Sequence, residues 1–202
     1  MESVVEMDLF GYDPAANLLP CDGEAYYHGP IFEGTYFGQL MRETEWRQDE
    51  AVIYGKRILT ARKVAWSGDK RYRYRYSGTE KIAQPWSPVL CQLRERVGEV
   101  LGVHFNSCLL NLYEDGSQGM AWHSDDETML RRHGVIASVS FGAERRFLFK
   151  HKKSGEKVEL MLEDGSLLVM KGTTQDHWLH SIPKMARVKD PRINLTFRQI
   201  LE

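Results

Sequence analysis

The 202-residue sequence has little of what marks a membrane or secreted protein. No uninterrupted apolar run approaches the roughly 20 residues that a transmembrane helix needs, so we expect no membrane partner. Residues 1–6 are acidic, whereas signal and transit peptides begin with basic residues. We therefore expect no signal peptide and a cytoplasmic protein, or a nuclear one if the organism is eukaryotic.

Cysteine is also scarce. The three cysteines, Cys21, Cys91 and Cys108, are odd in number, lie far apart and show no zinc-binding spacing. We expect them to be reduced thiols. The sequence also has no internal repeat, low-complexity tract or linker, which predicts one domain over residues 1–202. Within it we expect an N-terminal extension over about residues 1–105 and a β-rich core over about residues 106–202.

The net charge of −1 conceals a strong asymmetry along the chain. Residues 1–50 carry 11 acidic and two basic residues, whereas residues 56–76 carry eight basic residues and Asp69. Basic residues interleaved with aromatic ones are typical of surfaces that bind phosphates and stack bases, and the alternative is a solvated hairpin face. The basic residues are Lys56, Arg57, Arg62, Lys63, Lys70, Arg71, Arg73 and Arg75, and the aromatic ones are Tyr54, Trp66, Tyr72, Tyr74 and Tyr76.

The first half of the sequence predicts two helices and a small group of strands. Residues 1–30 have no sustained periodicity, so we expect an irregular arm. A helix capped by Thr35 should end before Trp46, and two or three antiparallel strands should span residues 51–76. A second helix should start at Pro88 after the N-cap Ser87 and stop at Gly102.

The second half predicts short strands separated by turns. Seven such strands after two helices indicate a mainly β fold with flanking helices, specifically an antiparallel jelly roll. The expected strands cover residues 108–113, 135–141, 146–150, 157–162, 166–170, 177–181 and 192–200.

A metal site is suggested by His123 and Asp125, because residues i and i+2 of an extended segment share a face. One more histidine would complete the 2-His-1-carboxylate triad of non-haem Fe(II) oxygenases. His180, in the run His-Ser-Ile-Pro, is our candidate; its competitor His177 would face the other way on a strand. We expect the other four histidines, His28, His104, His133 and His151, at the surface.

Residues 192–198 alternate between two kinds of side chain. One side carries apolar residues and the other carries Arg192, Asn194, Thr196 and Arg198. An edge strand with a solvated basic face is one interpretation. Beside a metal, the two arginines instead suit a dicarboxylate whose ends meet the metal and a guanidinium. Their Cα atoms should be about 20 Å apart, a span that two converging side chains can close around a five-carbon diacid.

At this point the sequence resembles the AlkB family of Fe(II)- and 2-oxoglutarate-dependent nucleic-acid dealkylating dioxygenases. The matching motifs occur in the family's order between residues 111 and 198, and residues 74–78 resemble an element of its eukaryotic-type DNA-repair branch. The motifs are Asn-x-Tyr at 111–113, His-x-Asp-Asp-Glu at 123–127, Ala-Ser-Val-Ser-Phe-Gly-Ala at 137–143, Gly-Ser-Leu-Leu-Val-Met at 165–170, His-Ser-Ile-Pro at 180–183 and Pro-Arg-Ile-Asn-Leu-Thr-Phe-Arg at 191–198.

The resemblance implies a double-stranded β-helix and roles for individual residues. It implies Fe(II) on His123, Asp125 and His180, with O2 as co-reactant. For 2-oxoglutarate it implies Arg192, Asn194 and Tyr113 at the distal carboxylate, and Arg198 and Asn111 near the metal-bound end. For the substrate we expect Tyr76 and His123 to sandwich a flipped base, Tyr74 to line the wall, Asp126 or Glu127 to favour its positive charge, Tyr54 to act as a wedge, and Lys56, Arg57, Arg62 and Lys63 to hold phosphates.

The implied activity is oxidative demethylation of N-alkylated bases such as 1-methyladenine and 3-methylcytosine in DNA, with RNA left open. The partner would be alkylated DNA, and we expect a monomer. An oxygenase of the same fold acting on protein or small molecules is the alternative. Such an enzyme would keep the triad and the arginines but would not need the basic aromatic stretch.

Overall fold

The computed structural model describes residues 2–4, 13–53, 56–76 and 79–201. For residues 2–4, 49–53, 56–58, 74–76 and 79–80 it describes only the backbone. None of the helices in these ranges has the length and apolar character needed to cross a membrane.

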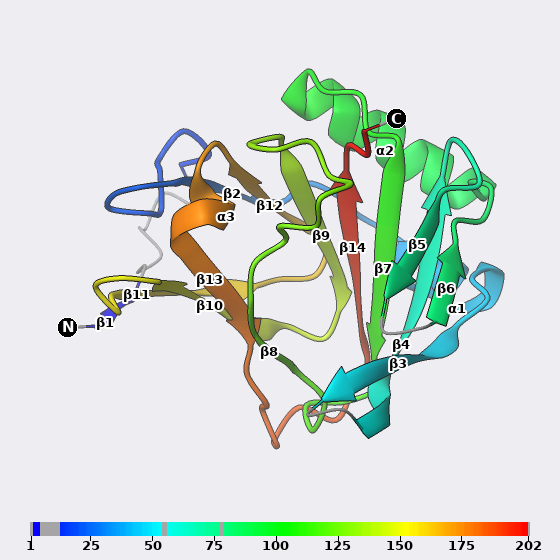
Figure 1. Cartoon of the computed structure of the whole chain (residues 1–202). Coiled ribbons are helices and arrows are strands. Elements are labelled where there is room, and N and C mark those ends of the chain that lie inside the picture. The colour runs from blue at the N-terminus through cyan, green and yellow to red at the C-terminus, as the bar shows by residue number, and fades with distance from the viewer. Residues whose placement is uncertain (1, 5–12, 54–55, 77–78, 202) are drawn as a thin grey trace.

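Two β-sheets face each other and make up the body of the chain (Figure 1). The larger has the strand order β2-β12-β9-β14-β7-β4-β3 and the smaller β1-β11-β10-β13-β8, with β5 and β6 as a separate pair. The strands are β1 Glu2–Val4, β2 Glu24–Pro30, β3 Arg47–Ile53, β4 Lys56–Gly68, β5 Arg73–Tyr76, β6 Thr79–Ile82, β7 Ser107–Tyr113, β8 Met120–His123, β9 Ile136–Gly142, β10 Arg145–His151, β11 Lys157–Leu162, β12 Ser166–Lys171, β13 Trp178–Ile182 and β14 Arg192–Arg198.

Strands β7 to β14 pass back and forth between the sheets. Strands β7, β9, β12 and β14 lie in the larger sheet, and β8, β10, β11 and β13 lie in the smaller one. Within this set the neighbouring strands are antiparallel. The predicted jelly roll is confirmed. Strands β2, β4 and β3 widen the larger sheet at its two edges.

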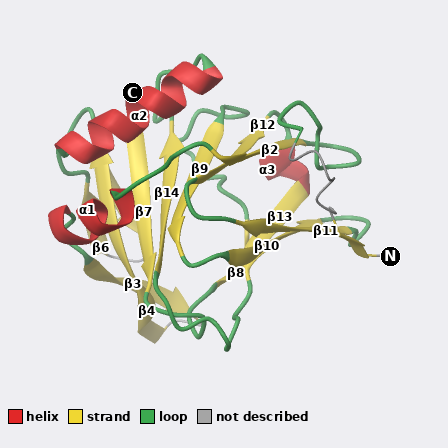
Figure 2. Ribbon diagram, turned by 180° about the vertical axis from the view of Figure 1, so that it is seen from behind, coloured by secondary structure: helices red, strands yellow, loops and turns green. Residues whose placement is uncertain are grey.

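Two helices, α1 (Tyr36–Glu43) and α2 (Pro88–Leu101), cover the outer face of the larger sheet (Figure 2). The predicted start and end of α2 are confirmed: the Ser87 hydroxyl accepts a hydrogen bond from the Leu90 N–H, and Gly102 adopts a left-handed conformation with φ 64°. Thr35 precedes α1 as predicted but makes no side-chain capping bond.

The apolar side of β14 packs against this helical layer. Ile193, Leu195 and Phe197 are fully buried in a core that also contains Leu93 and Val97 of α2. Burying each such side chain contributes about 1.5–3 kcal/mol, so this layer fixes β14 from behind. The opposite side of β14 is therefore directed toward the smaller sheet, where the polar residues of the strand lie.

The structure differs from the sequence predictions at several points, of which three concern named residues. Residues 24–30 form strand β2 rather than part of an irregular arm, with Ala25 and Tyr27 buried. The Gly29-Pro30 breaker ends this strand but does not prevent it. His177 is the last residue of α3 (Thr174–His177) and not part of a strand. His151, expected at the surface, is buried at the end of β10.

Candidate active site

Three side chains of the ligand type meet where β8 and β13 lie side by side. His123 ends β8, and His180 of β13 is its register partner across the antiparallel pair. The Asp125 Oδ1 lies 3.7 Å from His123 Nε2 and 3.8 Å from His180 Nε2. The ligand atoms of all three residues lie within 4.8 Å of one another. Two imidazoles and one carboxylate so arranged fit a facial triad for Fe(II).

The surroundings keep these groups in the forms that bind a metal. The Ala121 carbonyl oxygen lies 2.8 Å from His123 Nδ1 and can only accept, so Nδ1 donates and Nε2 keeps its lone pair. Burial lowers the pKa of His180 to about 4, so this imidazole is neutral at pH 7. Burial alone would raise the pKa of Asp125, but the cation of Arg198 and the two imidazoles lower it overall.

A second layer of contacts, not foreseen from the sequence, fixes the segment between the two ligands. The Gln175 side-chain oxygen accepts a hydrogen bond from the Asp125 N–H at 2.8 Å. Lys152 Nζ donates to the Gln175 carbonyl oxygen at 2.8 Å and to the Ser124 hydroxyl at 3.1 Å. Helix α3 and the segment after β10 therefore hold the backbone of residues 124–125 in place.

We expect Gln175→Ala to weaken Fe(II) binding by roughly ten- to a hundredfold, the usual effect of removing a group that orients a metal ligand. The Asp125 N–H would lose its acceptor, so the carboxylate would be held less firmly. Anaerobic Fe(II) titration measures the effect. The matched control is Asp176→Asn, because the Asp176 carboxylate faces His133 at 2.7 Å. Equal iron affinity in the two variants would contradict this role.

The polar side of β14 faces the protein interior and not solvent. Strand β14 lies between β9 and β7, so it is not an edge strand. Arg192 is 1% exposed and Arg198 is 7% exposed. This excludes a solvated basic face and leaves the interpretation in which the two guanidinium groups serve a ligand.

Arg192 has hydrogen-bond donors to spare. Its Nη2 donates to the Ser140 hydroxyl at 2.9 Å, and its guanidinium carbon lies 5.5 Å from the centre of the Tyr113 ring. Its Nε and Nη1 atoms are buried with no hydrogen-bond partner among the described residues. Burial lowers its pKa to about 10, so it remains charged at pH 7. A buried cation with free N–H groups fits a carboxylate ligand.

Arg145, which the sequence did not single out, also lies near the Tyr113 ring. Its guanidinium carbon lies 5.8 Å from the centre of that ring. Its Nη atoms donate to the carbonyl oxygens of Asp115, Gln118 and Pro183 at 2.7–3.2 Å. Arg145 therefore holds two loops together through both Nη atoms, and only its Nε lacks a partner among the described residues, whereas Arg192 has two such nitrogen atoms.

The remaining residues predicted to bind 2-oxoglutarate come together on β7 and β14. Asn194 is the register partner of Asn111, and Arg192 is that of Tyr113. Asn194 Nδ2 donates to the Ser138 hydroxyl at 2.8 Å. These positions form one polar patch along two adjacent strands.

Arg198 joins this patch to the triad. Its Nη1 lies 3.8 Å from Asp125 Oδ2 and 3.2 Å from Glu127 Oε1. Glu127, predicted to contact the substrate, is therefore paired with Arg198. Asp126 is exposed, and the Ser124 hydroxyl donates to it at 3.3 Å. Of these two acids, Asp126 is the more accessible to a substrate.

Two of the residues predicted to bind phosphate contact protein groups. Arg62 Nε donates to Asn111 Oδ1 at 2.9 Å, which places it beside the patch on β7 and β14. Lys63 Nζ lies 2.7 Å from Glu114. Trp66 and Tyr72, from the same basic stretch, pack on each other with ring centres 6.4 Å apart. These rings serve packing.

The other predicted substrate contacts are described in part or not at all. Lys56 and Arg57 begin β4, and Tyr74 and Tyr76 lie in β5, but their side chains are outside the described part of the chain. Tyr54 lies outside the described residues altogether. Their predicted roles therefore remain predictions.

Sequence comparison with known proteins shows the class of enzyme to which this fold and triad belong. Residues 34–198 match the 2OG-Fe(II) oxygenase superfamily. The DNA oxidative demethylase ALKBH2 of Mus musculus is 42% identical over 197 residues, which cover 92% of this chain and 82% of that protein. Human ALKBH2 is 42% identical over 176 residues, covering 82% and 67%. The alkB homolog 3 dioxygenase of Bos taurus is 39% identical over 173 residues, covering 81% and 60%.

The chain belongs to the AlkB family of Fe(II)- and 2-oxoglutarate-dependent dioxygenases. Its residues fit both groups that such an enzyme uses. The triad supplies two imidazole nitrogens and a carboxylate for Fe(II). The N–H groups of Arg192 that have no partner among the described residues suit the carboxylate of 2-oxoglutarate.

Proposed function

We propose that this enzyme removes alkyl groups from damaged bases, such as 1-methyladenine and 3-methylcytosine, in DNA. The observation that carries the proposal is the 42% identity, over 92% of the chain, with a protein named DNA oxidative demethylase. The triad and the buried arginines support the oxidative chemistry. The basic stretch over residues 56–76 supports a nucleic-acid substrate.

The protein's own side chains prepare the reaction by position and charge. His123, Asp125 and His180 would hold Fe(II), and Arg192 with Tyr113 would hold the distal carboxylate of 2-oxoglutarate. When bound, these two groups would activate O2, which is the oxidant: one oxygen atom hydroxylates the N-alkyl carbon, and the other is taken up as 2-oxoglutarate is oxidised to succinate and carbon dioxide. The hydroxylated methyl group then leaves as formaldehyde and restores the base. The protein contributes orientation, because a 1 Å misplacement can cost about a hundredfold in rate.

The lesion and the site are matched in charge. Methylation at N1 of adenine or N3 of cytosine makes the base cationic and blocks its pairing edge, so extruding it costs less than extruding a paired base. The exposed carboxylate of Asp126 follows directly after the triad residue Asp125 and would favour a cation there. Tyr76 and Tyr74 would stack on and enclose the base, as predicted from the sequence.

Mass spectrometry of treated oligonucleotides tests the proposed function. The enzyme with Fe(II) and 2-oxoglutarate should convert 1-methyladenine and 3-methylcytosine in DNA to the parent bases and release formaldehyde. Methylated peptides should not react in the same assay, and methylated RNA in that assay decides between DNA and RNA. Conversion of peptides with DNA left untouched would favour the alternative, a protein-modifying oxygenase.

We expect Tyr76→Ala and Asp126→Asn each to lower repair of methylated DNA while leaving 2-oxoglutarate consumption without substrate largely unchanged. Both changes remove contacts to the base and spare the metal and cosubstrate residues. Succinate release with and without methylated oligonucleotide separates the two activities. The matched control is Tyr72→Phe, since this ring packs on Trp66. Full repair by both test variants would contradict the proposed contacts of Tyr76 and Asp126 with the methylated base.

A further inference from the structure

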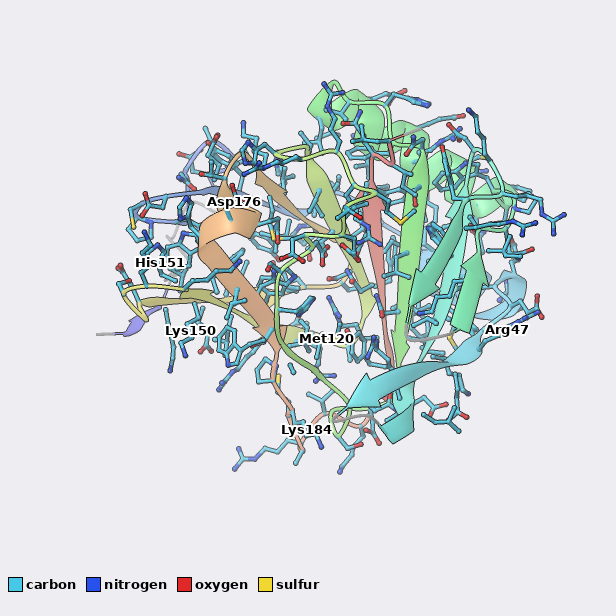
Figure 3. The ribbon with its side chains drawn as sticks, viewed as in Figure 1. Arg47, Met120, Lys150, His151, Asp176 and Lys184 are labelled. Carbon is cyan, nitrogen blue, oxygen red and sulfur yellow. The ribbon has the colours of Figure 1, made fainter. Side chains whose placement is uncertain are left out.

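Strands β5 and β6 form a sheet of their own, and β5 carries Tyr74 and Tyr76. Figure 3 shows this β5–β6 pair on the side of the molecule that carries Arg47 of β3, opposite to His151 of the smaller sheet. Among the described residues, the two strands form a ladder only with each other. Two isolated strands are only marginally stable, so the direction of the β5–β6 pair must be fixed where it joins the rest of the chain.

Main-chain hydrogen bonds tie both ends of the β5–β6 pair to neighbouring segments. The Gln84 N–H donates to the Trp66 carbonyl oxygen at 2.8 Å, and the Gly68 N–H donates to the Gln84 carbonyl oxygen at 3.0 Å. The Asp69 N–H donates to the Asn106 carbonyl oxygen at 3.0 Å. These bonds locate the two ends, and they leave the carboxylate of Asp69 for other partners.

The Asp69 carboxylate lies just before β5 and accepts hydrogen bonds from three side chains. Trp86 Nε1 and Arg94 Nη1 donate to Oδ1 at 2.7 Å and 2.6 Å. His104 Nε2 lies 3.3 Å from Oδ2 and is the donor, because a carboxylate only accepts. Arg94 lies on α2, Trp86 precedes this helix and His104 follows it. One carboxylate thus joins the start of the β5–β6 pair to α2 and to the segments on either side of it.

Trp86 connects this carboxylate to the core behind the active site. Its ring is stacked on that of Phe197 of β14, with ring centres 6.4 Å apart, and the Arg94 guanidinium carbon lies 4.6 Å from its centre. Phe197 is fully buried, and Arg198 follows it on β14. The side chains of Asp69 and Arg94 are 33% and 18% exposed. A charge-assisted contact that is partly buried is screened less by salt than one between exposed groups.

We propose that Asp69 is a positioning residue for recognition of the methylated base. Its carboxylate, held by Trp86 and Arg94, sets the direction of the β5–β6 pair and so the place of Tyr74 and Tyr76. This role rests on the proposed function, in which the two tyrosines enclose the base. Tyr76 is seven residues beyond Asp69, so a small tilt at the carboxylate becomes a larger displacement at the base.

Steady-state repair of methylated DNA by Asp69→Ala tests this role. We expect kcat/KM for the methylated oligonucleotide to fall by roughly ten- to a hundredfold, since a 1 Å misplacement can cost about a hundredfold in rate. Fe(II) affinity and 2-oxoglutarate consumption without substrate should stay at the parent values, which also shows that the variant is folded. Asp69→Asn keeps an acceptor for Trp86 Nε1 but loses the charge that faces Arg94, so its kcat/KM should lie between those of the parent and Asp69→Ala.

The matched control is Glu99→Ala. It removes a carboxylate that pairs with Arg96 on the same helix at 3.7 Å, far along α2 from the contacts of Asp69. This variant should repair methylated DNA as the parent does. A loss equal to that of Asp69→Ala would mean that any change of charge near α2 lowers repair, and it would overturn the role of Asp69.

A double-mutant cycle with Tyr76→Ala separates positioning from general support of the fold. If Asp69 acts through the β5–β6 pair, the double variant should lose less activity than the product of the two single losses, because the ring that Asp69 positions is already absent. Losses that multiply would overturn the proposal, as would parent-like repair by Asp69→Ala. If the parent itself leaves methylated DNA unrepaired, the proposed function fails as well, so the two failures are distinguishable.

Discussion

Replacing Asp125 or His180 by alanine is expected to reduce iron-dependent turnover to background. Each change leaves two protein ligands, which cannot hold Fe(II) while it also accepts cosubstrate and oxygen. Asp125→Ala has a further cost, because its carboxylate is also the partner of the Arg198 guanidinium at 3.8 Å. Anaerobic Fe(II) titration and succinate release measure binding and turnover separately.

The matched control for this prediction is His177→Ala. His177 is three residues before His180 but lies at the end of α3, outside the cluster of ligand atoms. This variant should bind iron as the parent does. Loss of iron from the His177 variant together with retention in the His180 variant would show that the third ligand is misassigned.

Arg192→Ala should weaken 2-oxoglutarate binding by roughly ten- to a hundredfold. A hydrogen bond to a charged group contributes about 1.5–3 kcal/mol, and 1.4 kcal/mol corresponds to a tenfold change in Kd. Arg192→Lys should weaken 2-oxoglutarate binding less than Arg192→Ala does, because lysine keeps the positive charge but loses the planar guanidinium group. Isothermal titration calorimetry with 2-oxoglutarate, with Fe(II) in place, gives the Kd of each variant.

Arg198→Ala should also weaken 2-oxoglutarate, but it frees Glu127 and Asp125 as well, so Arg192 is the cleaner test. Arg146→Ala is the matched control, because Arg146 pairs with Glu159 on the smaller sheet at 3.1 Å. If the Arg192 and Arg198 variants bind 2-oxoglutarate with the affinity of the parent, neither guanidinium binds the cosubstrate. DNA affinity should be unaffected in all of these variants.

The parts of the fold with strong local signals were predictable from the sequence. Helix α2 has Ser87 as its N-cap, proline at its first position and glycine just after its end. Serine and proline favour the start of a helix and glycine favours its end, so the sequence alone predicts both ends. Strand β8 was not predicted, because its four residues, Met120–His123, are too few to show a periodic pattern in the sequence. It exists because β13 provides a partner, and a partner distant in sequence leaves no local signal.

The candidate site was predictable to a different extent for each kind of residue. His123 and Asp125 are two residues apart, and periodicity alone suggests that they share a face. Gln175 accepts a hydrogen bond from the Asp125 N–H, but the two residues are 50 positions apart, so no local sequence pattern predicts this contact. His151 was expected at the surface because it ends a strand. In the fold its ring packs beside those of Trp178 and His177, with ring centres 5.0 Å and 6.3 Å away, contacts that the sequence does not show.

The buried guanidinium of Arg192 also makes the cosubstrate a stabilising ligand of the fold. Without a carboxylate, the interior holds a desolvated cation with two nitrogen atoms, Nε and Nη1, that find no partner in the described part of the chain. A ligand present at a hundred times its Kd stabilises the folded state by about 2.7 kcal/mol, a large share of the roughly 5–15 kcal/mol that keeps a typical domain folded. The steady-state amount of this enzyme, and its resistance to proteases, should therefore follow the metabolic supply of 2-oxoglutarate.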